Sequence, residues 1–161
     1  MKRTTILLAV LAIAALMTQP VFAQATATQT VNLTVNSIYK LAVSGNPGAL
    51  TISDMVVGAS SASTSDASSS YSMTTNVANS RMTAQLDAAL PAGLTLTIAL
   101  VGGNGTTAGT VDVSDGTAKN VVTAIARGAA NAQTITYGFT ADASAGAFTG
   151  SRVVTLTLTN P

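Results

Sequence analysis

Four residue types are missing from this 161-residue chain, which contains no cysteine, histidine, tryptophan or glutamate. Without cysteine there are no disulfides and no thiol chemistry. Without histidine, neither Ser–His–Asp nor Cys–His catalysis can be assembled, and zinc, copper or iron sites built on His or Cys are excluded. A general base would have to be a tuned Asp, Lys or Tyr. We therefore expect a protein that is not an enzyme and holds no cofactor.

Charge is also scarce, since charged residues make up only 8% of the chain. Lys2 and Arg3 precede an apolar run over residues 6–17, and residues 21–23 follow with a small-x-small cleavage pattern. The run is too short to cross ~30 Å of hydrocarbon, which argues against a membrane anchor. The sequence predicts a signal peptide over residues 1–23 and one exported domain over residues 24–161, in the periplasm, at the cell surface or outside the cell.

The predicted mature chain is close to neutral, with five Lys and Arg against six Asp and a net charge of −1. It has neither the basic patch of a nucleic-acid-binding protein nor a polybasic segment for anionic lipid. We expect no nucleic-acid partner and no membrane span in the mature chain. Its polar surface consists mostly of Ser, Thr and Asn, which are uncharged. Strand edges that carry them have little electrostatic repulsion to prevent pairing with other strands.

Alternation of apolar and polar residues recurs along the mature chain and predicts β-strands. About eight to ten short strands with no room for crossover helices indicate an all-β fold, a mostly antiparallel two-sheet β-sandwich of Ig-like or pilin-like type. Its core should be aliphatic, because the chain has few aromatic residues. The clear strand predictions cover residues 28–35, 38–43, 71–77, 81–87, 94–100, 133–141 and 151–160.

Other segments are less regular. Residues 71–77 and 81–87 resemble the two arms of a hairpin, and residues 49–57 predict one or two short strands. The Ser-rich residues 58–70 have no apolar period and predict an exposed, flexible loop. Two further segments are ambiguous: residues 110–117 fit a strand or a turn, and residues 118–126 fit a strand or a helix.

The first predicted strand carries Val31, Leu33 and Val35 on one face. Ala25 and Ala27 continue the same phase, and Gln29 is its single polar member. The final strand, with Val154, Leu156 and Leu158 facing inward, is a natural partner within the same domain. We expect this intrachain pairing in the isolated protein. The alternative is that Val31, Leu33 and Val35 form an assembly strand that fills a neighbouring subunit.

Two polar motifs suggest ligand sites. Asp112 and Asp115 precede Gly116 and supply two carboxylates for a weak calcium candidate. The spacing of an EF-hand is absent, however, and a turn explains Asp and Gly equally well, so we predict no metal site. The Gly-rich residues 102–109 lack the Gly-Lys-Ser/Thr ending of a phosphate-binding loop and predict a flexible connection.

The C-terminal stretch ITYGFTADASAGAFTGSRVVTLTLTN resembles the close of secreted pilin-like β-sandwiches, of the spore-coat-U and chaperone–usher fimbrial-subunit type. In those proteins a Thr-rich strand leads through a Gly-x-aromatic-Thr-Gly/Asp turn to a final alternating strand. Gly146, Phe148, Thr149 and Gly150 occupy that turn here. The stretch QTVNLTVNSIYKLAV is similar to the start of such subunits, although many of them carry a disulfide that this chain lacks. The resemblance implies an extracytoplasmic structural subunit that assembles by strand donation.

Two functions are consistent with these features. The first is an exported structural protein of the cell surface, a subunit of a pilus, filament or coat that assembles with itself or other surface proteins by β-strand addition. The alternative is a self-contained secreted adhesion or binding module that acts as a monomer or small oligomer. In that case the polar segments at residues 58–70 and 102–109 would form its contact surface.

Overall fold

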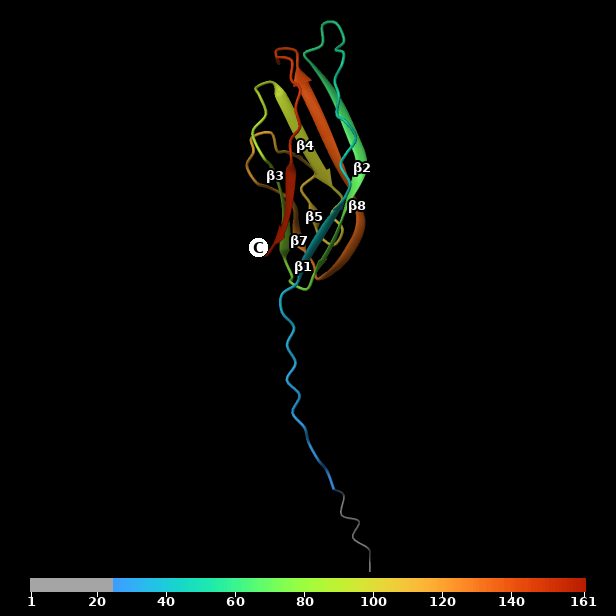
Figure 1. Cartoon of the computed structure of the whole chain (residues 1–161), viewed down its shortest axis with the longest axis vertical. Coiled ribbons are helices and arrows are strands. Elements are labelled where there is room, and N and C mark those ends of the chain that lie inside the picture. The colour runs from blue at the N-terminus through green and yellow to red at the C-terminus, as the bar shows by residue number, and fades with distance from the viewer. Residues whose placement is uncertain (1–24) are drawn as a thin grey trace, which may run out of the picture. The chain divides into compact units, whose positions relative to one another are not determined.

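The protein is all-β, as predicted, in a computed structural model that describes residues 25–161. The predicted signal peptide lies outside the described residues. All nine described strands lie within residues 35–161, which form one compact unit (Figure 1). The strands are β1 (Tyr39–Ser44), β2 (Ser61–Thr75), β3 (Ser80–Leu86), β4 (Leu94–Leu100), β5 (Thr106–Thr107), β6 (Thr110–Asp112), β7 (Lys119–Ile125), β8 (Gly128–Asp142) and β9 (Val154–Thr159).

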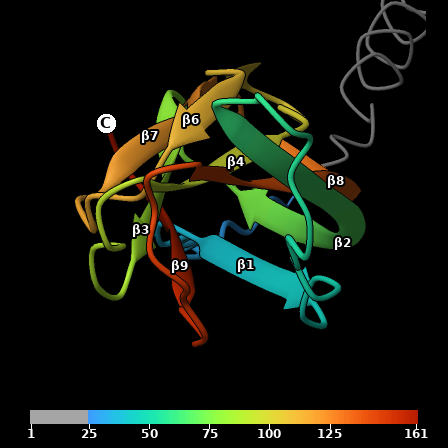
Figure 2. The ribbon, with the colours of Figure 1, turned by 90° about the horizontal axis from the view of Figure 1, so that it is seen from above.

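The strands form two antiparallel sheets in a sandwich-like arrangement. The first sheet has the order β1-β2-β8-β4-β6, and the second has the order β5-β7-β3-β9. The prediction of a mostly antiparallel two-sheet fold is therefore confirmed. The edge strands β1 and β9 lie on the same side of the sandwich, where they approach each other (Figure 2).

The core fills the space between the two sheets, and period-2 alternation produces it. In β4, Leu94, Leu96, Ile98 and Leu100 are buried, whereas the threonines between them are only half-buried. Such alternation places every second side chain of a strand on the same face of its sheet. The core is mainly aliphatic, as predicted, and its other fully buried members include Tyr71, Met82, Leu86, Val113, Val121, Val122, Ile125 and Ile135.

The Ser-rich segment predicted to be a flexible loop is a strand, so that prediction was wrong. Residues 61–70 form the first half of β2 and pair with β8, from Ser61 opposite Asp142 to Ser70 opposite Thr134. The partner strand supplies the apolar side chains that this half lacks. A strand can therefore form without an apolar period of its own when a neighbour provides the ladder hydrogen bonds and the core contacts.

The predicted hairpin between residues 71–77 and 81–87 was also wrong. β2 pairs with β1 and β8, whereas β3 pairs with β7 and β9 in the other sheet. One face is buried in β3 and in the second half of β2, and the short connection after β2 carries the chain from one sheet to the other. Asn79 turns the chain there with a φ of 60°, a conformation that Asn tolerates better than most residues.

Two further strand predictions fail in the described chain. Residues 49–57 contain no strand, and neither do residues 28–35, where the first assembly strand was expected. β9 is present as predicted, but its ladder partner is β3. The ambiguous residues 118–126 form β7, and residues 110–117 form β6 followed by a turn. Across residues 25–161, no helix has the length and apolar character needed to cross a membrane.

Candidate functional site: an open apolar groove

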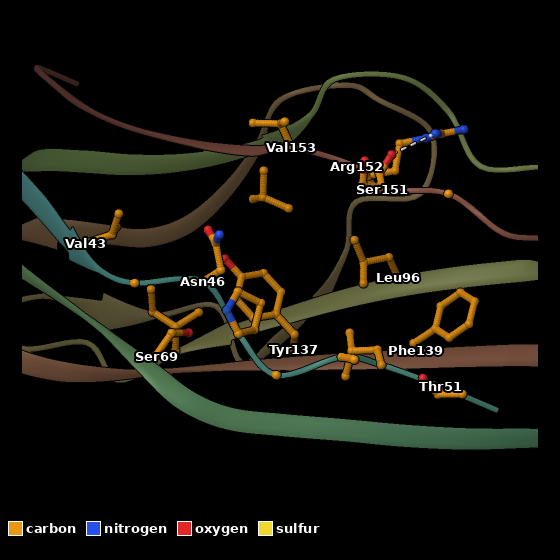
Figure 3. A pocket seen from close by; sticks show the side chains of 18 of the residues that line it. Val43, Asn46, Thr51, Ser69, Leu96, Tyr137, Phe139, Ser151, Arg152 and Val153 are labelled. Carbon is orange, nitrogen blue, oxygen red and sulfur yellow. Dashed lines mark hydrogen bonds between the residues drawn. The ribbon is translucent and has the colours of Figure 1, made fainter. Parts of the chain in front are cut away.

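A groove of about 960 Å³ opens on the side of the sandwich where β1 and β9 lie. Leu96 of β4 and Ile135, Tyr137 and Phe139 of β8 line it from the core (Figure 3). One wall consists of the end of β1 and residues 45–52, and the other of residues 148–154 and Leu156. The groove is thus a gap in the side of the core, large enough for several apolar side chains.

The groove exists because the two edge strands are short. β1 ends at Ser44, opposite Ser70, while β2 continues for nine more residues to Ser61. The segment after β1 contains no strand, and β9 does not begin until Val154. The core is therefore incompletely covered here. Six of its partly buried side chains line the groove: Leu41, Leu50, Leu90, Phe139, Val154 and Leu156.

A polar group sits in this apolar surrounding without a partner. Ser69 lines the groove and is only 4% exposed, and its Oγ has no hydrogen-bond partner in the described residues. A buried hydroxyl without a partner is costly and uncommon in folded proteins. Ser69 and Tyr137 lie on one side of the groove, facing Val153 and Arg152 on the other (Figure 3).

A β-bulge points Ser69 inward. Asp66 is opposite Tyr137 and Ser69 is opposite Ile135, so three steps along β2 match two steps along β8. Before the bulge the even-numbered residues of β2 are the more buried ones, and after it the odd-numbered residues are buried. Bulges redirect side chains in this way and are often found beside functional sites. Ser69 is the first inward residue after the change of phase.

The loop before β9 forms the other wall of the groove. The guanidinium of Arg152 lies over the ring of Phe148, with 5.3 Å between Cζ and the ring centroid. Its Nε is buried without a hydrogen-bond partner in the described residues. Phe148, Thr149 and Gly150, which belong to the turn highlighted by the sequence resemblance, line the groove. Gly146 is in the same loop and is not part of the lining.

Asp66 holds residues 45–52 against β2. Its carboxylate accepts hydrogen bonds from the hydroxyl of Ser68 at 2.7 Å and from the backbone N–H of Ser68 at 3.0 Å. These bonds, together with one from the N–H of Gly48, hold the pKa of Asp66 below its ordinary value. A Cβ atom at position 48 would lie 2.8 Å from Oδ2 of Asp66, so the two segments are in close contact.

This contact predicts a response to acid. The lowered pKa means that ionised Asp66 favours the folded state above its ordinary pKa, near 3.8, and that this benefit disappears as the pH falls through the lower folded-state value. We expect Asp66→Asn to lower the thermal unfolding midpoint slightly at pH 7, and by progressively less as the pH falls below the ordinary pKa of 3.8. Thermal unfolding from pH 7 to pH 2 measures this, with exposed Asp87→Asn as control. An equal difference at both pH values would contradict the prediction.

The residues predicted to form the assembly strand are exposed. Val31 is 68% exposed, Leu33 is 87% exposed and Val35 is 81% exposed. Among residues 25–37 there is no regular secondary structure. The first anchored residue after this segment is Asn36, whose carbonyl oxygen accepts a 2.8 Å hydrogen bond from the side chain of Asn76. Residues 25–35 are called the arm below.

The terminal-strand residues behave differently. Val154, Leu156 and Leu158 are half-buried in β9 and pack against the core. The first two also line the groove. The structure therefore places the final strand at the site, with its partner β3 on one side and the groove on the other.

The two aspartates of the calcium candidate are engaged in local turns. Asp112 accepts a 2.8 Å hydrogen bond from the N–H of Ser114, and Asp115 accepts one of 2.9 Å from the N–H of Thr117. Asp115 also forms an ion pair with Lys119 at 2.6 Å, which is the main reason that its pKa falls to about 2. Residues 25–161 contain no group of three or more acidic, histidine or cysteine side chains that would hold a metal ion.

Tyr137 and Arg152 are the titratable side chains among the described residues that line the groove. Burial raises the pKa of Tyr137, so its phenol is uncharged at neutral pH. Burial also raises the pKa of Tyr71, whose hydroxyl donates a hydrogen bond to the carbonyl oxygen of Val101. The arrangement can bind an apolar segment, offer it the buried hydroxyl of Ser69 as a hydrogen-bond partner, and pair with it through the open edges of β1 and β9.

No protein-family model, curated protein or solved structure matches this chain. The candidate site therefore rests on the geometry described above.

Proposed function

We propose that this chain is an exported structural protein of the cell surface, a subunit of a pilin-like filament, pilus or coat that assembles by β-strand addition. The arm of one copy would enter the groove of the next copy. The observation that carries this proposal is an incompletely covered core in a chain that also has an exposed, alternating apolar segment. The arm offers an apolar side chain at every second position, and six partly buried side chains of the core line the groove.

The side chains of the arm support this function. Val31, Leu33 and Val35 follow one another in steps of two residues, so in an extended strand they lie on one face at intervals of ~7 Å. Burial of each such side chain contributes about 1.5–3 kcal/mol. A donated strand would therefore gain a substantial free energy from contacts that the isolated subunit does not make.

The backbone at the groove supports it as well. β1 and β9 are edge strands of the two sheets, so each has one side without a ladder partner in the described chain. An exposed sheet edge accepts an additional strand through main-chain hydrogen bonds, while alternate side chains fill pockets and give specificity. Few charged groups surround this edge, and Arg152 is the one charged residue among the described side chains that line the groove.

A self-contained adhesion module has less support. Its expected contact surface included residues 58–70, and most of that segment is strand rather than loop. The other expected contact segment, residues 102–109, contains the short strand β5 and packs on β7 through the pair Thr106 and Thr123. Residues 102–109 contribute to a smaller pocket of about 380 Å³, and from residues 58–70 Ser69 alone is among the described residues that line the groove.

Deletion of the arm tests the function. We expect the mature protein to form polymers that elute early in size-exclusion chromatography and appear in electron micrographs. Removal of residues 24–35 should leave a monomer with nearly the same unfolding midpoint, because the deletion spares Asn36 and its hydrogen bond to Asn76. A mature protein that stays monomeric under all conditions, from cells that carry no surface polymer, would rule the proposal out.

A further inference from the structure

We infer that Gln29 of one copy pairs with the buried hydroxyl of Ser69 in the next copy, and that this pair fixes the register of the arm in the groove. The inference rests on the proposed function and adds to it by naming the contact that selects one alignment. It concerns the one polar residue in the apolar phase of the arm, Gln29, and a buried serine of the groove whose Oγ has no hydrogen-bond partner in the described residues.

Ser69 is the buried polar residue of the groove lining, whose other polar members are more exposed. Its inward neighbours are Tyr71, two residues further along β2, and Ile135, which is opposite it in β8. Both are almost fully buried and belong to the hydrophobic core. A serine at this position leaves a hydroxyl without a partner, whereas alanine or valine would not. A ligand that supplies one hydrogen-bonding group at this level would remove that cost.

Gln29 is the polar exception in the arm. It is in phase with Ala25 and Ala27 before it and with Val31 and Leu33 after it. When the apolar face of the arm is buried, the amide of Gln29 is buried with it, which is costly unless the amide finds a hydrogen bond. A carboxamide both donates and accepts, so it can satisfy a serine hydroxyl in either role.

The spacings along the two strands match. Ser69 is opposite Ile135 in the ladder between β2 and β8, and the inward row of β8 then continues with Tyr137 and Phe139. In the arm, Gln29 is followed in phase by Val31 and Leu33. Both rows advance two residues at a time, or ~7 Å per step. With Gln29 at the level of Ser69, Val31 and Leu33 reach the levels of the two aromatic rings.

The same alignment sets the direction of the arm. The ladder with β1 begins at Ser70 and runs toward Thr75, so β1 lies entirely on one side of Ser69, and there it approaches β9. The small side chains of Ala25 and Ala27 would lie on that side. The arm would then run in the direction of β8, which is opposite to β9: β8 rises in Figure 1, and the red C-terminal strand descends. Antiparallel pairing on β9 is also the slightly more stable kind.

Other registers of the arm in the groove are less favourable. A shift by one residue would turn Thr30, Asn32 and Thr34 toward the core. A shift by two residues keeps the apolar face inward but puts Ala27 or Val31 at Ser69, and leaves both the hydroxyl and the amide of Gln29 without partners. The polar pair thus separates one register from its nearest in-phase alternatives.

Disulfide mapping tests the register directly. Because the chain has no native cysteine, only the introduced cysteines can form a disulfide. Mature chains with Gln29→Cys and with Ser69→Cys are prepared separately, mixed under assembly conditions and oxidised. We expect a disulfide-linked pair of chains in at least tenfold higher yield than when Ala27→Cys or Val31→Cys replaces Gln29→Cys. Equal yields for the three arm positions would overturn the inference. A chain that carries both Gln29→Cys and Ser69→Cys and closes on itself as a monomer would overturn the choice of a second copy.

A double-mutant cycle tests the hydrogen bond itself. Gln29→Leu leaves the hydroxyl unpaired, and Ser69→Ala leaves the amide unpaired, so each should raise the protein concentration needed for assembly about tenfold. The double variant should assemble better than either single variant, because no polar group remains buried. If the wild type assembles and the effects of the two substitutions on the concentration needed for assembly simply add, the Gln29–Ser69 contact is overturned and the proposed function is not. Failure of the wild type to assemble would instead reject the proposed function.

Discussion

A chain with Val31→Asp and Leu33→Asp will fold as the wild type does but will not polymerise. Both side chains are largely exposed in the subunit, so charge at these positions leaves the core untouched. In the assembled state the same positions would be buried among apolar side chains, where an unpaired carboxylate is very unfavourable. We expect the concentration required for assembly to rise at least a thousandfold, on the order of 4 kcal/mol or more. Sedimentation of polymer at increasing protein concentration measures it.

The control for this variant lies on the other face of the arm. Asn32→Asp with Thr34→Asp introduces the same two charges one residue further along the chain. Because alternate residues of a strand point to opposite faces, these carboxylates would remain in solvent, and assembly should change less than tenfold. Equal losses in the two variants would show that charge on the arm matters and that its alternation does not, which contradicts strand addition.

A second large effect is expected from Ile98→Ala, which should lower the free energy of unfolding by about 3–4 kcal/mol. Ile98 is fully buried in the middle of β4 and belongs to the core cluster, whose members come from both sheets. Its removal leaves a cavity that neighbours from two sheets cannot close by small movements. Urea unfolding of the isolated subunit, followed by circular dichroism, gives the change.

Leu156→Ala is the matched control for the open side of the core. Leu156 is only partly buried and lines the groove, so its truncation should cost the isolated subunit less than half of the loss for Ile98→Ala. In the polymer a donated strand would cover Leu156, and the loss there should grow. Equal losses for the two variants in the isolated subunit would mean that the core is already closed on this side.

The sandwich itself was predictable because the strands that build it carry their own pattern. Residues 94–100 have alternating Leu, Ile and Thr, and β4 begins and ends at those residues. β9 and the central part of β8 also alternate, although β9 covers only Val154–Thr159 of the predicted residues 151–160 and β8 extends beyond the predicted residues 133–141. In these strands one face is more buried than the other, and the alternation of apolar and polar residues in the sequence reflects this difference in burial.

The long strand β2 was only half predictable. Its second half alternates around Tyr71 and Met73, whereas its first half reads as a polar loop and is a strand because β8 pairs with it. The hairpin prediction failed for a related reason. Alternation shows that two neighbouring segments are strands, but it does not show whether they belong to one sheet or to the two opposed sheets.

The candidate site was predictable in part. The phase of Val31, Leu33 and Val35 predicted a strand that the described chain does not contain, and their role in assembly stays a prediction. The terminal strand with Val154, Leu156 and Leu158 is present as predicted. The groove was not predictable, because it depends on which strands end early and which edges meet. Ser69 was missed because it lies in a run of serines where nothing distinguishes one from the next. The signal was the change of phase between residues 66 and 69, which becomes visible only once the partner strand is known.

The far side of the sandwich ends in β5 and β6, which have two and three residues respectively. Such short edges offer little backbone for further pairing. A subunit with one groove and one arm would then make two contacts, both head to tail, and contacts of that kind give open filaments rather than closed rings when the rotation between copies does not close. The filament would be unbranched and polar, with a vacant groove at one end and a free arm at the other. A copy that lacks its arm could still occupy one end, where it would cap growth and set the length of the fibre.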